Sequence, residues 1–192
     1  MNLDLKDLIT RTDELTEKIP ERNSKCKYCK DADDHLVCYS DADWGNEIIE
    51  RLSITGNCIK LQGGVISWTN KRQGTVALPT TEAEYISLSS ITQEIIWLRE
   101  LIKEIDYEVI RDAINIYCDN NGAVQLTNNK IISNKSKHID IRQYFIRQHV
   151  SNSEVHVEYL AAEAMLADQS TKPLPKAKHE FLVIEYGLSN SL

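Results

Sequence analysis

A long amphipathic stretch that carries an acidic residue among its apolar positions is the feature that most constrains the fold. Residues 81–105 predict a helix, because apolar side chains recur every three or four positions and form one stripe. Glu84 lies on the same stripe, four residues before Leu88. A carboxylate on a core-facing surface is unusual and requires a physical reason. The fold must therefore give a reason for a carboxylate at this position.

Strand and helix signals alternate around this helix. The expected strands are residues 36–41, the hairpin arms 54–62 and 65–70 around Gly63-Gly64, residues 113–118 and residues 155–160. The expected further helices are residues 122–129, 136–150, 161–171 and a last one within 175–188 that ends at Gly187. Three successive strands followed by alternating helices and strands favour an α/β fold, in which a mixed sheet is flanked by helices.

The N-terminal region has a different composition. Residues 2–19 predict an amphipathic helix, and residues 20–34 are polar, are broken by Pro20 and predict a linker. Residues 46–53 predict a loop. The first residues are too charged for a secretion signal, and no stretch approaches the ~18 apolar residues of a membrane helix, so an intracellular protein without a membrane partner is expected.

Five cysteines, an odd number without framework spacing, indicate reduced thiols. Cys26 and Cys29 form a CxxC pair, which favours a surface turn over a zinc site because no second pair follows at zinc spacing. The net charge of −7 indicates that the chain binds nucleic acid weakly by itself or relies on a partner or metal ions.

Four acidic residues stand beside apolar strand-like or helix-like runs: Asp41, Glu84, Asp119 and Asp168. Brought together, their charges would need a cation, and such a pocket suits a phosphodiester hydrolase that uses two Mg²⁺ ions. Each residue also has a simpler interpretation. Glu84 could complete a capping box with Thr81, Asp119 could cap a helix, and Asp168 could be a solvated helix residue.

The first strand leaves a choice open. Asp41 and Asp43 are two residues apart, so their side chains face the same way, and either could close the strand in an Asx turn. The residues alone do not rank them.

Several motifs occur in a fixed order between about residue 33 and residue 175, over roughly three quarters of the chain. They are CYSDADWG, RLSITG, VISWTNKRQGTVALPTTEAEYISL, EIIWLRELI, IYCDNNGAV, SKHIDIRQYFIRQHV, EYL and LADQSTKPLP. This ordered set resembles the ribonuclease H domain of copia-type (Pseudoviridae) LTR-retrotransposon Pol polyproteins. The sequence departs from the family pattern at Leu52, Ile54, Ala164 and Gln143-Tyr144.

The resemblance implies a ribonuclease H-like fold with a mixed five-stranded sheet whose three N-terminal strands are antiparallel. It places this domain at residues 33–172, between an unmatched helix and linker at 1–32 and a helical tail at 173–192. It selects Asp41 over Asp43 and implies that Asp41 bridges two Mg²⁺ ions (Mn²⁺ being possible), that Glu84 and Asp119 complete one ion, and that Asp168 completes the other.

The implied activity is cleavage of the RNA strand of RNA–DNA hybrids, as a hydrolase of the transposable element, with the parent reverse transcriptase domain as a partner in cis or in trans. The location would be the cytoplasm, in a virus-like particle, or the nucleus. The expected phosphate contacts are Lys71, Arg72, Lys135, Lys137 and Arg142. A catalytically inactive or domesticated fragment that binds nucleic acid or protein is the alternative, favoured by the acidic charge, by Ala164 and by the lack of a polymerase motif.

Overall fold

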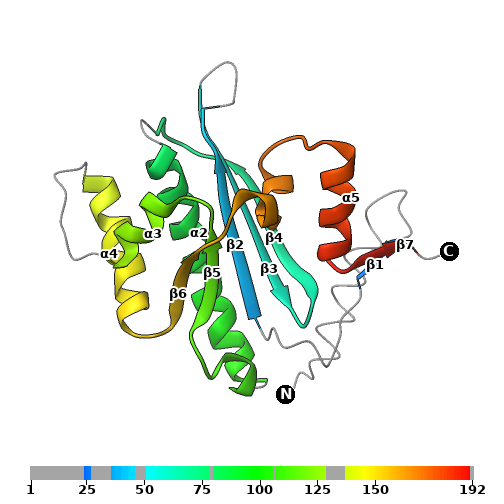
Figure 1. Cartoon of the computed structure of the whole chain (residues 1–192). Coiled ribbons are helices and arrows are strands. Elements are labelled where there is room, and N and C mark those ends of the chain that lie inside the picture. The colour runs from blue at the N-terminus through cyan, green and yellow to red at the C-terminus, as the bar shows by residue number, and fades with distance from the viewer. Residues whose placement is uncertain are drawn as a thin grey trace.

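The computed structural model describes residues 24–26, 36–45, 51–77, 80–105, 107–128 and 137–190. Its centre is a five-stranded mixed sheet with the strand order β4-β3-β2-β5-β6 (Figure 1). The strands are β2 (Leu36–Asp43), β3 (Ile54–Leu61), β4 (Gly64–Arg72), β5 (Ile114–Cys118) and β6 (Val155–Tyr159). Strands β2, β3 and β4 are antiparallel, whereas β5 and β6 run parallel to β2. The predicted sheet is therefore confirmed.

Helices cover both faces of the sheet. The elements are α2 (Thr80–Lys103), α3 (Asn121–Asn128), α4 (Lys137–Ser151), α5 (Lys176–Glu185) and the 3₁₀ helices η1 (Tyr107–Ile110), η2 (Ala162–Ala164) and η3 (Leu166–Ser170). In Figure 1, α2, α3 and α4 lie together at one side of the sheet, and α5 lies at the other side beyond β4. The four α-helices agree with the expected helices apart from small shifts at their ends.

Two apolar clusters fill the spaces between these layers. Ile59 belongs to the larger one, which contains the buried stripe of α2, whereas its neighbour Cys58 belongs to a smaller one with Leu182 and Tyr186 from the α5 region. Successive residues of a strand point to opposite faces, so β3 is buried on both sides. This explains why its sequence lacks the alternation of a half-exposed strand.

The β3–β4 hairpin has a two-residue turn of Gln62 and Gly63, one residue earlier than the predicted Gly63-Gly64 turn. Both residues have positive φ, 49° and 82°, as a type I′ turn requires, and Gly64 is already the first residue of β4. The sheet needs only one glycine at this turn, because Gln62 accepts the left-handed conformation.

The sequence predicts one helix over residues 161–171, and this prediction is wrong. It forms η2 and η3, separated by Met165 in an extended conformation with φ −71° and ψ 107°. Residues 165–168 are all buried, although a surface helix would leave one side of each turn exposed. Tertiary burial thus overrides the high helix propensity of this alanine-rich segment.

A second, two-stranded sheet joins the two ends of the described chain. Strand β1 (Ser24–Cys26) pairs antiparallel with β7 (Leu188–Asn190). Part of the predicted linker 20–34 is therefore a strand, and Cys26 belongs to it rather than to a turn. The predicted helix 2–19, Cys29 and residues 46–50 lie outside the described residues. The domain boundaries at 32/33 and 172/173 stay predictions.

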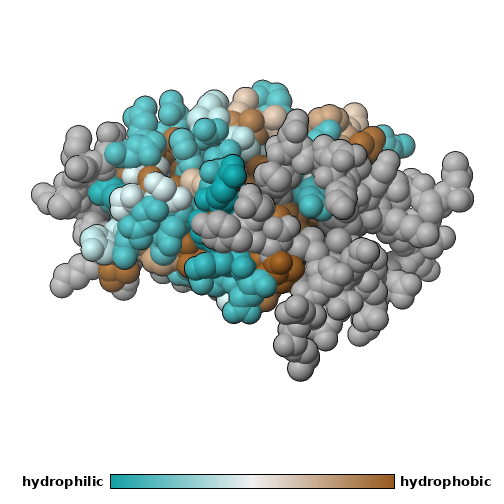
Figure 2. Space-filling view, turned by 90° about the horizontal axis from the view of Figure 1, so that it is seen from below, coloured by the Kyte–Doolittle hydropathy of each residue, from teal (hydrophilic) through white to brown (hydrophobic). Residues whose placement is uncertain are grey.

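The acidic ends of β2 and β5 lie at the upper end of the sheet in Figure 1. The lower end shows mostly hydrophilic side chains over its described surface, with hydrophobic ones scattered among them (Figure 2). Among the described residues, no helix is both long enough and apolar enough to cross a bilayer.

Candidate active site

Glu84 lies in the first turns of α2, and the residue is only 5% exposed. Its carboxylate accepts a hydrogen bond from the backbone amide of Ala42, at the end of β2. The side chain is thus directed from the helix toward the sheet, which is not the geometry of a capping box with Thr81. The acidic position on the apolar stripe is explained by this placement: it brings a carboxylate to the end of the central strand.

Asp41, near the end of β2, is 2% exposed and makes its contacts on the side of η3. Its Oδ2 accepts a hydrogen bond of 2.6 Å from Thr171 Oγ1, and Lys172 Nζ lies 3.9 Å from the same oxygen. Ser87 Oγ donates to the Asp41 carbonyl oxygen at 2.9 Å and thereby ties α2 to the strand. Of the two aspartates of this strand, Asp41 is buried, whereas Asp43 is partly exposed.

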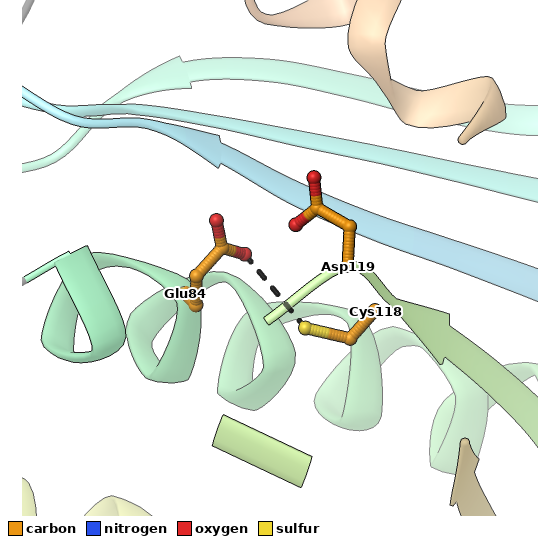
Figure 3. A group of neighbouring side chains, drawn as sticks. All are labelled: Glu84, Cys118 and Asp119. Atoms are coloured by element: carbon orange, nitrogen blue, oxygen red, sulfur yellow. Dashed lines mark hydrogen bonds between the residues drawn. The ribbon is translucent and has the colours of Figure 1, made fainter. Parts of the chain in front are cut away.

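Asp119 directly follows β5 and meets Glu84 across a short gap. Ligand atoms of Glu84, Cys118 and Asp119 all lie within 4.8 Å of one another. Figure 3 shows the two carboxylates directed toward a shared space beside β2, with the Cys118 thiol below them. Cys118 Sγ donates to Glu84 Oε2 at 3.9 Å. Among the described residues, this is the only group of three or more such side chains that could hold a metal ion.

The helix-cap interpretation of Asp119 does not hold. Asn120 Oδ1 accepts a hydrogen bond of 3.0 Å from the amide of Ala123 and so caps the N-terminus of α3. Asp119 is therefore available for the cluster with Glu84.

Asp168 lies in η3, is 1% exposed and contacts two lysines. Lys172 Nζ is 2.7 Å from its Oδ1, and Lys178 Nζ from α5 contacts its Oδ2. The solvated-residue interpretation of Asp168 is thus wrong. The 3₁₀ geometry matters here, because it turns Asp168 inward against β2 and β3 instead of leaving it on the surface of a helix.

Gly56 in β3 makes this close approach of η3 possible. A Cβ at this position would lie 2.3 Å from Thr171 Cγ2 and 3.0 Å from the Ala167 carbonyl oxygen. Asn70 of β4 adds a hydrogen bond of 2.6 Å from its Nδ2 to the Ser170 carbonyl oxygen. The lack of a side chain at Gly56 and the hydrogen bond from Asn70 therefore let η3, with Asp168, pack closely against the sheet.

The pKa values of three of the acids are raised, whereas that of the fourth is lowered. Burial, together with the charges of Asp41 and Asp119, raises the pKa of Glu84 to about 9. Burial also raises the pKa of Asp41 to about 6, against the opposing effects of Thr171 and Lys172. Burial and the charge of Asp168 raise the pKa of Asp119. These three carboxyls lack enough positive charge to ionise easily.

Asp168 behaves differently. Burial raises its pKa, but the hydrogen bonds from Lys172 and Lys178 outweigh burial and hold the pKa below the ordinary value of an aspartate. The pKa of Lys172 is raised because its contacts with Asp168 and Asp41 outweigh its own burial. The carboxyls on the Glu84 side therefore have raised pKa values, whereas the charge of Asp168 is compensated by two lysines.

Three of the five expected basic contacts line one groove. Lys71 and Arg72 at the end of β4 and Arg142 of α4 face the outer side of α2 around a space of about 510 Å³, beside Glu82 and Gln93. Lys135 lies outside the described residues, and for Lys137 only its place at the start of α4 is described.

The residues expected from the sequence do not include Cys118, Lys172 and Lys178, which contact the acidic side chains. Cys118 precedes Asp119, and strand alternation alone would place the two on opposite faces; Asp119 escapes that rule because β5 ends before it. The spacing of Asp168 and Lys172, four residues apart, is a signal for contact that sequence inspection can find. Lys178 reaches the site only because α5 folds back, so no local pattern indicates it.

Solved structures identify the class of fold. Ribonuclease H1 from Halobacterium salinarum NRC-1 matches with a TM-score of 0.54 at 12% identity, over 71% of this chain and 94% of that one. LC11-RNase H1 in complex with an RNA/DNA hybrid matches with a TM-score of 0.51 over 71% and 93% of the two chains. The protease–reverse transcriptase of prototype foamy virus matches over 81% of this chain and 21% of that one, with a TM-score of 0.51. The chain has the ribonuclease H fold.

Sequence comparison gives the relatives. The Pol polyprotein of transposon TNT 1-94 from Nicotiana tabacum is 37% identical over 149 residues, 78% of this chain. That of transposon RE1 from Arabidopsis thaliana is 34% identical over 154 residues. The chain spans 11% and 10% of the lengths of these two relatives. No family model matches the chain. It is thus a relative of copia-type retrotransposon Pol polyproteins that has the ribonuclease H fold, as the ordered motifs indicated.

Proposed function

We propose that the chain is a Mg²⁺-dependent endoribonuclease that cleaves the RNA strand of RNA–DNA hybrids. One observation carries the proposal: in a ribonuclease H fold, Asp41, Glu84, Asp119 and Asp168, from four distant segments, converge at one end of the sheet. The ionisation of each of the four is influenced by at least one other member. Burying so much acidic charge is costly for a fold, and a bound cation offsets the cost.

The donor set fits a hard divalent cation. Carboxylate oxygens are the ligands that Mg²⁺ prefers, and Glu84 and Asp119 already lie within the 4.8 Å cluster. We propose that Asp41, Glu84 and Asp119 hold one ion and that Asp41 and Asp168 hold a second. Such ions supply a nucleophilic water and stabilise the leaving oxygen of a phosphodiester.

The chain's own residues orient this set. Ser87 and Thr171 fix Asp41 from two sides, through its carbonyl oxygen and its carboxylate. The amide of Ala42 and the thiol of Cys118 fix Glu84. A carboxylate held by such partners loses little conformational entropy when it binds, which is the purpose of preorganisation.

The groove of Lys71, Arg72 and Arg142 supports the nucleic-acid part of the proposal. The chain carries a net charge of −7, so a local group of three cations is a notable departure from its surroundings. Cationic side chains on the flank of α2 would bind backbone phosphates and position a duplex without reading its sequence. The match to a ribonuclease H1 that is bound to an RNA/DNA hybrid agrees with this role.

We further propose that the parent reverse transcriptase is the partner, in cis or in trans, and that the protein acts in the cytoplasm, in a virus-like particle, or in the nucleus. The relatives are Pol polyproteins, and a protease–reverse transcriptase contains a similar fold. A partner with basic surface would compensate for the weak autonomous binding that the acidic charge predicts.

Incubation of the chain with a labelled RNA–DNA hybrid in Mg²⁺ or Mn²⁺ tests the proposal. We expect cleavage of the RNA strand only, abolished by EDTA and by Asp119→Asn. The control Asp112→Asn alters an exposed aspartate, one side-chain oxygen of which lies 3.8 Å from Arg111, and should leave cleavage intact. Hybrid binding without any cleavage at high protein concentration would reject the enzymatic proposal.

One observation favours the alternative of a binding module. A protein named secreted RxLR effector protein 161, from Plasmopara viticola, is 54% identical over 63 residues, a third of this chain. A part of this sequence therefore occurs outside a polyprotein, in a relative that matches it over too short a stretch to align with both Asp41 and Asp168. The hybrid assay distinguishes the two functions, because a module would bind hybrid or protein without cleaving RNA.

A further inference from the structure

We propose that Lys172 is a positioning residue that competes with a divalent cation for the oxygens of Asp41 and Asp168. The inference rests on the proposed function, because it concerns the metal-binding step of the same site. It adds a residue with a defined role: an internal ammonium group that orients two carboxylates and sets the affinity of one half of the site.

The geometry of Lys172 carries the proposal. Its Nζ is 2.7 Å from Asp168 Oδ1 and 3.9 Å from Asp41 Oδ2, so one ammonium group reaches both carboxylates. The lysine side chain is 36% exposed, whereas the side chains of Asp41 and Asp168 are almost fully buried. The lysine side chain thus runs from the solvent-exposed surface to an ammonium group that lies among buried carboxylate oxygens. A cation that bound the same oxygens would repel Lys172 or displace it.

The Glu84 side of the cluster has no such group. Within the described part of the chain, no ion pair joins Glu84 or Asp119 to a lysine or an arginine. We therefore expect two unequal binding steps: a first at Glu84 and Asp119, and a weaker one at Asp41 and Asp168 that requires Lys172 to move.

Lys178 makes the displacement feasible. It contacts the other oxygen of Asp168 from α5 and donates at 3.0 Å to the Ala162 carbonyl oxygen. Asp168 therefore keeps one cationic partner when Lys172 leaves. Lys172 lies just after η3, and Thr171 beside it stays bonded to Asp41 and to the Asp168 carbonyl oxygen, so only the lysine side chain has to swing out.

Calorimetric titration of Mn²⁺ and Mg²⁺ into the full chain tests the inference, with Lys172→Gln, Lys172→Arg and Lys176→Gln as variants. We expect Lys172→Gln to tighten the weaker step by about tenfold, a change that isothermal titration resolves. Lys172→Arg keeps the charge and should retain wild-type binding. Lys176 pairs with Glu180 on the exposed surface of α5, its side chain 89% exposed, so Lys176→Gln should change nothing.

Thermal unfolding in EDTA and in saturating Mg²⁺ gives the second measurement. If Lys172 compensates the carboxylates, Lys172→Gln lowers the melting temperature in EDTA, and the deficit disappears in Mg²⁺. A merely structural lysine would give the same deficit in both conditions, and this result would overturn the inference.

The outcomes also separate the inference from the proposed function. Wild-type binding that Lys172→Gln leaves unchanged overturns the inference alone. Absence of divalent-ion binding in both the wild type and Lys172→Gln overturns the inference together with the metal-dependent part of the proposed function.

Discussion

The buried carboxyl of Glu84 makes a quantitative prediction about stability. Burial raises its pKa from 4.5 to about 9, so at pH 7 the folded chain without divalent ions must keep a proton on a group that the unfolded chain ionises. Each pH unit between 4.5 and 7 costs about 1.4 kcal/mol, so the total is on the order of 3 kcal/mol. Glu84→Gln removes this cost because the amide is neutral and keeps an acceptor for the Ala42 amide.

The sign of the pH dependence follows from the raised pKa. The neutral carboxyl favours the folded state fully below pH 4.5, and this contribution is lost as the pH rises toward 9. In EDTA we therefore expect Glu84→Gln and the wild type to have similar free energies of unfolding near pH 4.5, and the variant to be more stable at pH 7 and still more so at pH 8.5. Mg²⁺ should reduce the difference by stabilising the wild type.

Urea unfolding at these three pH values measures the effect. Glu100→Gln, on the same helix, is the matched control, because that side chain is 68% exposed and its replacement should change the free energy of unfolding little. A Glu84→Gln variant that is equally stable or less stable than the wild type at pH 8.5 in EDTA would refute the reasoning, since it would show that the carboxyl is compensated in the fold.

Three further predictions concern the support of the site and the thiols. Gly56→Ala should lower the free energy of unfolding by about 1–3 kcal/mol and reduce RNA cleavage, because the new methyl group displaces η3. Urea unfolding and the hybrid assay measure these two effects. A variant with unchanged stability and cleavage would contradict the contact distances at Gly56. Thr171→Val removes the hydroxyl that donates to Asp41 and should lower the free energy of unfolding by about 1–3 kcal/mol at pH 8. The decrease should be smaller at pH 4, where Asp41 is protonated. Equal decreases at both pH values would argue against this hydrogen bond. Three thiols should react with a disulfide reagent only after unfolding, and rapid reaction of more than two of the five in the native chain would contradict their burial. The protected thiols are Cys38, Cys58 and Cys118.

The sheet and the long helix were accessible from the sequence because their signals are local. The apolar stripe of residues 81–105 predicts α2 within two residues at each end, and the hairpin pattern predicts β3 and β4. The segment 161–171 failed for a physical reason: its alanines favour a helix, but burial of consecutive residues in the tertiary structure favours 3₁₀ turns.

In the candidate site too, some residues follow from local sequence signals and others depend on the tertiary structure. The four acidic residues could be chosen from their positions after apolar runs and from the ordered motifs. Strand alternation could not rank Asp41 against Asp43, because both side chains face the same way and the deeper burial of Asp41 depends on the rest of the fold. Lys178 was not accessible at all, since its contact with Asp168 depends on how α5 returns to the sheet.

The pairing of β1 with β7 has a topological consequence. Ser24 and Asn190 are register partners, so a short peptide could join these two positions without crossing the molecule. New ends opened at Gln62 and Gly63 would then lie at the end of β3 remote from Asp41, which pairs with Gly56. Circular permutation at this turn should therefore keep the order of strands in space, and a permuted chain could be inserted into a loop of a carrier protein with its acidic end facing outward.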